Sequence, residues 1–346
     1  MVVLCTPDTP WPETLAQPCV ALGNFDGMHR GHQIVFKETQ DLAHSLGKKP
    51  VLVTFEPHPR TFFTPHRPIF RLTELPIKKA LAELFNMRGI FVFPFTAELG
   101  AMGPDAFLNR LKEVLNPSGL VIGHDFHFAK GRTGTPAFLR QWAHDHGILV
   151  RTVSPVRTSP IGDCISSSII RTCLAAGDVK GAADLLGYFW VVSGDVIHGE
   201  KRGHALGYPT INIHLPENCG LRYGAYVVRV RTEDAVHEGV ASFGIRPTFE
   251  DTHGGPVLEV HLLSEQVPNL YQAHVTIEFL DWIHEEKKCP SVQALIALIA
   301  KDCAYGRSFF KGTMASHASL VMAGKDDQVP KKNGPINLPF SSIRCE

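Results

Sequence analysis

The stretch Gly23-Asn24-Phe25-Asp26-Gly27-Met28-His29-Arg30-Gly31-His32 lies between an apolar run, residues 20–22, and a segment with helical spacing through Leu42. This pattern predicts a strand that turns directly into a helix. A helix start presents backbone N–H groups and the positive end of the helix dipole, which suits a phosphate. Gly31 would let a polyphosphate approach the backbone, and the His29 and His32 imidazoles can donate hydrogen bonds to it. The stretch therefore favours a site for nucleotide phosphates over a site for peptide cleavage.

Strand and helix patterns alternate through the first half of the chain. Short apolar runs at residues 51–55, 90–93, 120–123 and 149–153 predict strands, with helices expected at 77–85, 104–115 and 139–146. This alternation predicts a doubly wound α/β parallel sheet, with ligands at the carboxyl ends of its strands. Gly23, Glu56-Pro57-His58 and Gly123 all fall at such ends, so we expect one site to gather them.

The pattern changes after Gly187. Residues 166–186 predict one or two short helices, whereas 191–198, 225–231, 238–243, 257–263 and 275–279 are successive strand candidates without helices between them. Such a series predicts a small antiparallel β-barrel, followed by a helix at 291–305. We therefore expect a doubly wound α/β domain at 1–186, a barrel domain with its C-terminal helix at 187–311 and a disordered tail at 312–346.

Composition narrows the classes of function. The chain has 346 residues, of which 44% are hydrophobic and 20% charged, and its formal net charge is zero. Two globular domains fit this length, and the absence of a basic excess argues against a nucleic-acid partner. The eight cysteines form no C-x-x-C pair, and we find neither a secretory signal nor a membrane-spanning run. We expect a cytoplasmic protein without a membrane partner; its oligomeric state stays open.

A second cluster in the first half also suits phosphate. Ser166, Ser167 and Ser168 precede an apolar run and predict a helix N-cap, with Arg171 about one turn inside. Hydroxyls and a guanidinium at a helix start suit a triphosphate. Taken alone, residues of this kind are more often an ordinary cap beside a surface arginine.

Taken together, the two clusters resemble one family. The pattern Gly23-x-Phe25-Asp26-Gly27-x-His29-x-Gly31-His32, joined with Ile165-Ser166-Ser167-Ser168-x-x-Arg171, is similar to the adenylyltransferase module of bacterial bifunctional FAD synthetases (riboflavin kinase/FMN adenylyltransferase). Residues 55–59 and 123–128 also match, whereas Ala129 and Ile169 depart from the family's pattern.

The resemblance implies that residues 1–186 form a nucleotidyltransferase-like domain. It also implies in-line attack of the FMN phosphate on the α-phosphorus of ATP, with pyrophosphate leaving. It implies that His29 and His32 serve catalysis. The ATP contacts that it implies in this module are Gly23, Asn24, Phe25, Asp26, His29, His32, Ser167, Ser168 and Arg171. Candidate flavin contacts are His58, Asp125, Phe126, Phe128 and Arg246.

A different phosphate site is indicated in the second half, where no G-x-x-x-x-G-K-[ST] motif occurs. Residues 194–212 are rich in glycine, which allows the backbone to wrap phosphates. Thr210 and Asn212 alternate along an extended segment, so their side chains face the same way. A hydroxyl and an amide carbonyl suit Mg²⁺, although a glycine-rich hairpin with a polar edge fits the pattern without a ligand.

The segment 258–262 alternates between two faces. Leu258, Val260 and Leu262 take one face, and Glu259 and His261 take the other. From periodicity alone, Glu259 is a solvated strand carboxylate. With residues 244–249, however, the segment resembles the riboflavin kinase core, which implies that Glu259 is the general base and that Thr210 and Asn212 hold the metal. The ATP contacts implied for this module are Gly199, Arg202, Gly203, His204, Gly207, Pro209 and Thr210.

The resemblance implies an enzyme that uses ATP and Mg²⁺ to convert riboflavin to FMN and then FMN to FAD. The kinase half departs from the family at His204, Ser242, Ile245, Cys289 and near His284. These departures leave two alternatives open. One is an FMN adenylyltransferase with a weakened or lost kinase, and the other is a non-catalytic flavin- or nucleotide-binding regulator.

Overall fold

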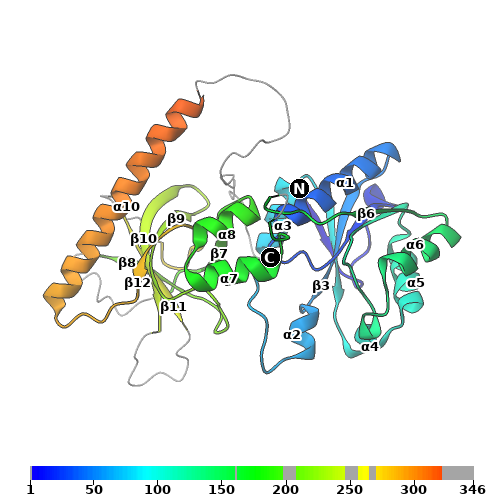
Figure 1. Cartoon of the computed structure of the whole chain (residues 1–346), viewed down its shortest axis with the longest axis horizontal. Coiled ribbons are helices and arrows are strands. Elements are labelled where there is room, and N and C mark those ends of the chain that lie inside the picture. Colours follow the sequence, from blue (N-terminus) through cyan, green and yellow to red (C-terminus); the bar gives the residue numbers. More distant parts are fainter. Residues whose placement is uncertain (1, 160–161, 198–207, 246–255, 265–269, 322–346) are drawn as a thin grey trace. The chain divides into compact units, whose positions relative to one another are not determined.

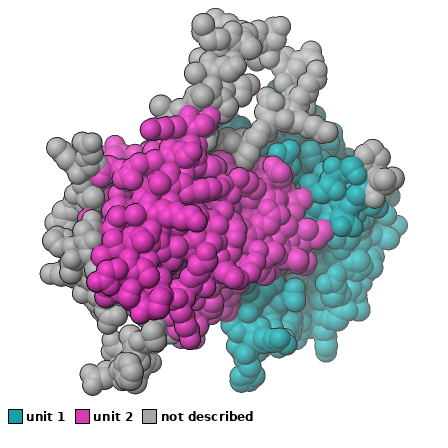
Figure 2. All heavy atoms as spheres, turned by 60° about the vertical axis from the view of Figure 1, so that its left-hand side comes forward, with its two compact units in different colours: residues 1–167 teal, residues 168–346 magenta. Residues whose placement is uncertain are grey.

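The computed structural model describes residues 2–159, 162–197, 208–245, 256–264 and 270–321. The chain forms two compact units, residues 1–167 and 168–346, which are coloured separately in Figure 2. Each unit has its own sheet (Figure 1), and each is described by itself.

A six-stranded sheet forms the centre of the first unit, with the strand order β1-β4-β3-β2-β5-β6. Every neighbouring pair is parallel, which confirms the predicted parallel sheet. Its central strands are apolar because both faces are covered. The strands are β1 (Val3–Cys5), β2 (Cys19–Leu22), β3 (Pro50–Glu56), β4 (Gly89–Pro94), β5 (Gly119–Gly123) and β6 (Leu149–Val153).

Helices pack on both faces of this sheet. Helix α1 packs against β2, β3 and β5, whereas α5 and α6 share a hydrophobic core with the other face, which includes Leu22, Val53 and Leu120. The sequence analysis contains no strand at β1, which has only three residues and lies at the sheet edge. The helices are α1 (Arg30–Ser45), α2 (Pro59–Phe63), α3 (Leu75–Leu84), α4 (Ala97–Ala101), α5 (Pro104–Leu115) and α6 (Pro136–Asp145), with 3₁₀ turns at Glu13–Leu15 and Lys130–Arg132.

The strand order reverses direction between β2 and β5, which makes this pair the switch point of the sheet. Leu22 pairs with Val53 of β3, and Ala21 pairs with Val121 of β5. The three strand ends predicted to share a site therefore lie side by side. The switch point is where doubly wound sheets bind ligands.

The second unit contains an antiparallel, nearly closed six-stranded barrel with the strand order β7-β12-β9-β10-β11-β8. An isolated bridge between Ile197 and Asn212 links the two ends of this order. The sequence analysis predicted a barrel but not a separate strand at β8. The strands are β7 (Val191–Asp195), β8 (Thr210–His214), β9 (Gly224–Arg231), β10 (Val236–Gly244), β11 (Val257–Leu262) and β12 (His274–Glu285).

Two short helices, α7 (Ser167–Ala176) and α8 (Val179–Leu186), precede the barrel. The backbone N–H of Arg222 donates to the Leu174 carbonyl at 3.0 Å, and Lys180 forms an ion pair with Asp281 at 2.8 Å. These contacts place nearly all of the helix pair in the second unit, whereas the sequence analysis drew the domain boundary at residue 186. The boundary at residue 186 stays a prediction.

Helix α10 (Val292–Val321) packs against β9 and β10. Phe310 packs with Val227 and Leu280, and the Tyr305 hydroxyl donates to Asp281 at 2.9 Å. The helix continues past residue 312, where the sequence analysis placed the start of a disordered tail; residues 322–346 lie outside the described residues. Among the helices of the described part of the chain, none has the length and apolar character needed to cross a membrane.

Candidate active sites

The loop between β2 and α1 has an unusual backbone. Phe25, Gly27 and Met28 have positive φ angles of 47°, 85° and 37°. Such a conformation is costly for residues other than glycine, and it persists only where the surroundings hold it. The Phe25 and Met28 side chains are buried, which holds the loop in this shape. Backbone strain of this kind concentrates at functional sites and marks the loop as a candidate.

His29 ends the loop and caps α1. Its Nδ1 accepts a hydrogen bond from the backbone N–H of His32 at 3.3 Å, so Nδ1 carries the lone pair and the ring proton lies on Nε2. The two imidazoles stack with their centroids 3.7 Å apart. His29 is only 5% exposed, which excludes a solvated histidine on the helix surface.

His32 is a neutral residue at neutral pH. Burial lowers its pKa well below 6.5, and the nearby His29 and Lys78 lower it further. Its Nδ1 is inaccessible to solvent and has no hydrogen-bond partner within the described residues. His32 can therefore interact with phosphate oxygens as a neutral donor rather than as a cation.

Gly31 has a role that the sequence did not reveal. A Cβ atom at this position would lie 3.1 Å from Cε1 and Nδ1 of His29, closer than side chains usually approach. We had expected Gly31 to admit a polyphosphate, and the structure adds that it makes room for the capping imidazole.

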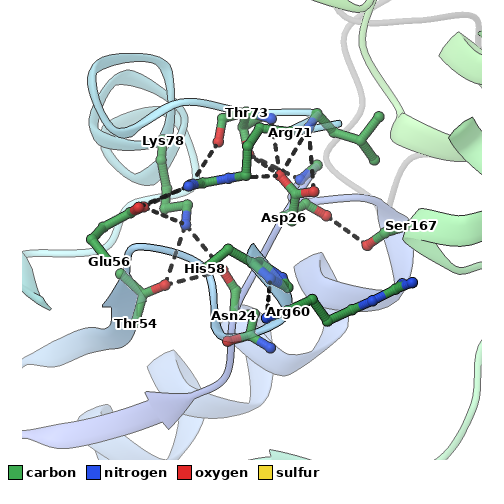
Figure 3. A network of polar contacts seen from close by, with 12 residues as sticks. Asn24, Asp26, Thr54, Glu56, His58, Arg60, Arg71, Thr73, Lys78 and Ser167 are labelled. Atoms are coloured by element: carbon green, nitrogen blue, oxygen red, sulfur yellow. Dashed lines mark hydrogen bonds and ion pairs between the residues drawn. The ribbon is translucent and has the colours of Figure 1, made fainter. Parts of the chain in front are cut away.

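A buried cation lies among polar groups beside this loop (Figure 3). Lys78 on α3 is 1% exposed, and its Nζ donates to the Asn24 carbonyl at 3.0 Å and to the Thr54 hydroxyl at 3.2 Å. Thr54 in turn donates to the same carbonyl at 3.0 Å. Burial, with the Arg71 charge as the next cause, lowers the pKa of Lys78 to about 8.

Arg71 and Glu56 form the second part of this network. The guanidinium binds the carboxylate through two contacts, of 2.8 and 2.6 Å. Although burial opposes it, this pairing holds the pKa of Glu56 below its usual value. The Lys78 ammonium lies 3.7 Å from the same carboxylate. The charges of Lys78 and Arg71 are thus balanced by two carboxylates, those of Glu56 and Asp26.

Asp26 belongs to this network through its side chain. Its carboxylate accepts hydrogen bonds from the backbone N–H groups of Leu72 and Thr73, each at 3.0 Å at the nearest oxygen. These bonds tie the loop to residues 71–73. The Asp26 carboxylate thus faces residues 72 and 73, and its predicted contact with ATP stays a prediction.

The serine cluster divides between the two units. The Ser167 hydroxyl donates to the Asp26 carbonyl at 2.8 Å and so contacts the loop directly. Ser168 and Arg171 follow in α7, which continues into the second unit.

The candidate flavin contacts differ in how exposed their side chains are and in which groups they bind. His58 caps α2 by accepting from the Arg60 N–H at 3.1 Å, and the Asp125 side chain is 81% exposed. Phe126 stacks on Phe128, whose own ring is buried in the hydrophobic core. Core packing leaves little of the Phe128 ring surface for a ligand, so it is the weakest of these candidates.

An aromatic cluster near the ends of β3 and β4 was absent from the sequence analysis. Phe62, Phe63 and Phe95 meet edge to face with centroids 5.3 to 5.6 Å apart. Phe63 is 63% exposed, which is unusual for so large an apolar side chain. This cluster, here called the Phe62–Phe63–Phe95 platform, offers a ring surface to solvent.

The candidate residues of the second unit lie opposite each other on two strands. Glu259 of β11 pairs with Asn212 of β8, and His261 pairs with Thr210. Directly paired residues share a face, so all four side chains lie on the face opposite to that of Leu258 and Val260. Asn212 is 3% exposed and Glu259 is half-buried, which differs from a fully solvated strand carboxylate.

The residues that depart from the family's pattern in the second unit lie in different surroundings. Ser242 pairs with Glu259 from the other side, and Ile245 is exposed. His284 binds Asp302 of α10 at 2.9 Å, so it links the barrel to this helix. Cys289 is partly exposed. Six candidates lie outside the described residues: Gly199, Arg202, Gly203, His204, Gly207 and Arg246.

Two different family models match the two halves of the chain. A family model described as FAD synthetase matches residues 12–169, and one described as riboflavin kinase matches residues 186–310. The two helices between these matches are those that pack with the barrel.

A crystal structure described as a macrolide-efflux protein from Streptococcus pneumoniae has a similar fold, with a TM-score of 0.77. It is 26% identical in sequence, and the match covers 88% of this chain and 99% of that one. This similarity supports the fold described above. The efflux function named in the description is said of that protein alone.

Three curated relatives match most of the chain, and each is described as a bifunctional riboflavin kinase/FMN adenylyltransferase. Those from Pseudomonas fluorescens and Listeria monocytogenes are 36% and 32% identical, and each match covers 84% of this chain and 92% of the relative. The relative from Escherichia coli strain K12 is 30% identical, with 84% and 93% covered. With both family models matched in the same order, the chain belongs to the family of bifunctional riboflavin kinases/FMN adenylyltransferases.

Proposed function

We propose that the second unit phosphorylates riboflavin to FMN and that the first unit adenylylates FMN to FAD. The observation that carries this proposal is the match of one family model, FAD synthetase, to residues 12–169 and of another, riboflavin kinase, to residues 186–310, each over residues that include a candidate phosphate site. ATP is the second substrate of both steps. We also propose a cytoplasmic location for the chain, where its substrates ATP and riboflavin would be available.

In the first unit, a phosphate oxygen of FMN attacks the α-phosphorus of ATP. A new P–O bond forms while the bond to the pyrophosphate oxygen breaks, and no covalent enzyme intermediate is required. We assign the binding of the triphosphate to the Nε2–H of His29 and the first turn of α1, and the capping geometry of His29 supports this assignment. Ser167, Ser168 and Arg171 are its further proposed ligands, and the guanidinium stabilises the charge that develops on the leaving group.

The buried network positions this machinery. Lys78 holds the Asn24 carbonyl, and the Asp26 carboxylate holds the backbone of residues 72 and 73, so the strained loop is fixed at two points before ATP arrives. A fixed loop avoids reorganisation during the reaction, which is the main cost that preorganised sites remove. We assign Lys78, Arg71 and Glu56 this supporting role.

The flavin of FMN is a large planar ring that needs an aromatic or apolar surface. The Phe62–Phe63–Phe95 platform provides one next to the carboxyl end of β3, and His58 lies on the same connection. Offset or edge contacts between aromatic rings each stabilise by about 0.5–1.5 kcal/mol. We propose that the platform and His58 contact the flavin, with Asp125 and Phe126 as further candidates.

In the second unit, Glu259 accepts the proton of the terminal ribityl hydroxyl while that oxygen attacks the γ-phosphorus of ATP, and ADP leaves. Thr210 and Asn212 fit Mg²⁺, because their hydroxyl and amide oxygens share a face and Asn212 is almost fully buried beside Glu259. When bound there, Mg²⁺ would neutralise charge on the phosphates. Pro209 and the glycine-rich residues before it are the proposed ATP contacts.

The experiment that tests the proposal separates the flavins formed by the purified protein with ATP and Mg²⁺. Riboflavin should give FMN and FAD, and FMN should give FAD and pyrophosphate. FAD from FMN but not from riboflavin would instead show a lost kinase. Flavin binding without any consumption of ATP would show a non-catalytic regulator.

A further inference from the structure

One side chain on the kinase face contacts the backbone just before the proposed metal ligands. Nδ1 of His261 lies 2.9 Å from the carbonyl oxygen of Pro209. A carbonyl only accepts hydrogen bonds, so Nδ1 carries the proton and donates it. The Tyr208 ring meets the imidazole edge to face, with centroids 5.3 Å apart. The imidazole is thus fixed in both tautomer and orientation.

Among the described residues, the segment that His261 holds has few other supports. In this part of the chain, strand β8 is the last strand in the sheet order, with β11 as its one ladder partner and a single bridge, Ile197 to Asn212, on its other side. Thr210 is the first residue of β8, and the ends of elements are where structure opens most readily. Pro209 has no N–H with which to extend the ladder.

From this arrangement, we propose that His261 is a positioning residue of the riboflavin kinase site. Its Nδ1–H holds the Pro209 carbonyl, which fixes the start of β8 and therefore the Thr210 hydroxyl relative to Asn212 and Glu259. The inference rests on the proposed kinase function. Groups that orient metal ligands typically change metal affinity or activity by about 10- to 100-fold when they are removed.

Two substitutions of His261 test whether the hydrogen bond to the Pro209 carbonyl matters, because both keep a polar side chain but only one can keep this bond. His261→Asn places an amide N–H near the position of Nδ1, whereas His261→Gln places its amide near Nε2. We expect H261N to retain FMN formation within about 3-fold of wild type and H261Q to lose about 10-fold or more, with a higher Mg²⁺ concentration for half-maximal rate. FAD formation from added FMN should stay at the wild-type rate in both variants.

Hydrogen–deuterium exchange without ATP or Mg²⁺ gives a second readout. The amides of residues 211–214 should exchange faster in H261Q than in wild type and H261N, while those of β9 and β12 stay unchanged, which shows that the barrel is folded.

The two failures can be distinguished. Absence of FMN from the wild-type protein would contradict the proposed function, and the exchange data would still test the tether. Equal kinase rates and equal exchange in H261N and H261Q, with an active wild type, would overturn the role of His261.

Discussion

Asn212 and Glu259 lie directly opposite each other across the β8–β11 ladder, one almost fully buried and the other half-buried. The pair places an amide oxygen and a carboxylate on one face at a distance that two neighbouring strands set. A rigid sheet positions such groups better than loops do. The kinase site therefore has its proposed base and one proposed metal ligand fixed by the barrel itself.

Glu259→Gln tests the base. The amide keeps the shape of the side chain but cannot accept the hydroxyl proton, so we expect FMN formation to fall by about 10²- to 10⁴-fold. FAD formation from added FMN should not change. Glu238→Gln, at an exposed position of β10, is the matched control and should leave both rates unaltered. A rate of FMN formation in E259Q equal to that of E238Q would show that Glu259 is not the base.

His29→Asn separates the capping role of His29 from its proposed chemistry. Asparagine is among the best N-cap residues, so α1 should keep its stability. The variant lacks the Nε2–H donor, and we expect FAD formation from FMN to fall by about 10²-fold or more. His44→Asn, in the exposed last turn of α1, is the control. Unchanged FAD formation in H29N, measured as pyrophosphate release, would remove His29 from the reaction.

Gly31→Ala tests the fit between the glycine and the capping imidazole. The new Cβ would lie 3.1 Å from the His29 ring, which must shift. Since a small displacement of a catalytic group costs up to about 10²-fold, FAD formation should drop while FMN formation continues. Gly103→Ala is the control, because a Cβ there meets no atom within 4 Å. Equal FAD-forming rates in the two variants would contradict this role.

The lowered pKa of Lys78 should make the free energy of unfolding of the first unit depend on pH. The folded protein releases the Lys78 proton near pH 8, whereas the unfolded chain retains it to its usual pKa of 10.5. The unfolded state therefore binds more protons between these values, and the free energy of unfolding of the first unit gains a contribution that rises with pH.

Lys78→Met should lack this rise, and Lys79→Met, at a partly exposed neighbouring position, should keep it. The measurement is the urea midpoint of unfolding at several pH values from 7.5 to 9.5. Pulse proteolysis detects the unfolding, and only fragments from the first unit are counted. Parallel pH profiles for wild type and K78M would mean that Lys78 does not titrate in this range.

Both sheets were predictable because their patterns are local. Alternation of apolar strands and helices predicted the parallel sheet, and strands without helices predicted the barrel. The end of α10 was less predictable, because residues 313–321 follow Gly312 and show no clear helical period of apolar residues. Strand β8 was described only as an extended segment, since its pairing with β11 joins residues about fifty positions apart.

The same distinction applies to the sites. His29, His32 and Gly31 form one contiguous motif, so the sequence identified them. The network of Glu56, Arg71 and Lys78 joins three separate segments, and no local pattern connects them. One signal was present: Lys78 lies on the buried face of α3 with Ile77, Leu81 and Ala82, where a charge needs partners.

The central claim, two separate active sites linked by FMN, is tested most directly by mixing two inactive variants. E259Q alone and H29N alone should each give little FAD from riboflavin, for opposite reasons. An equimolar mixture should restore FAD, because H29N makes the FMN that E259Q consumes. A mixture that makes no FAD, although H29N releases FMN and E259Q converts added FMN, would contradict exchange of FMN between separate sites.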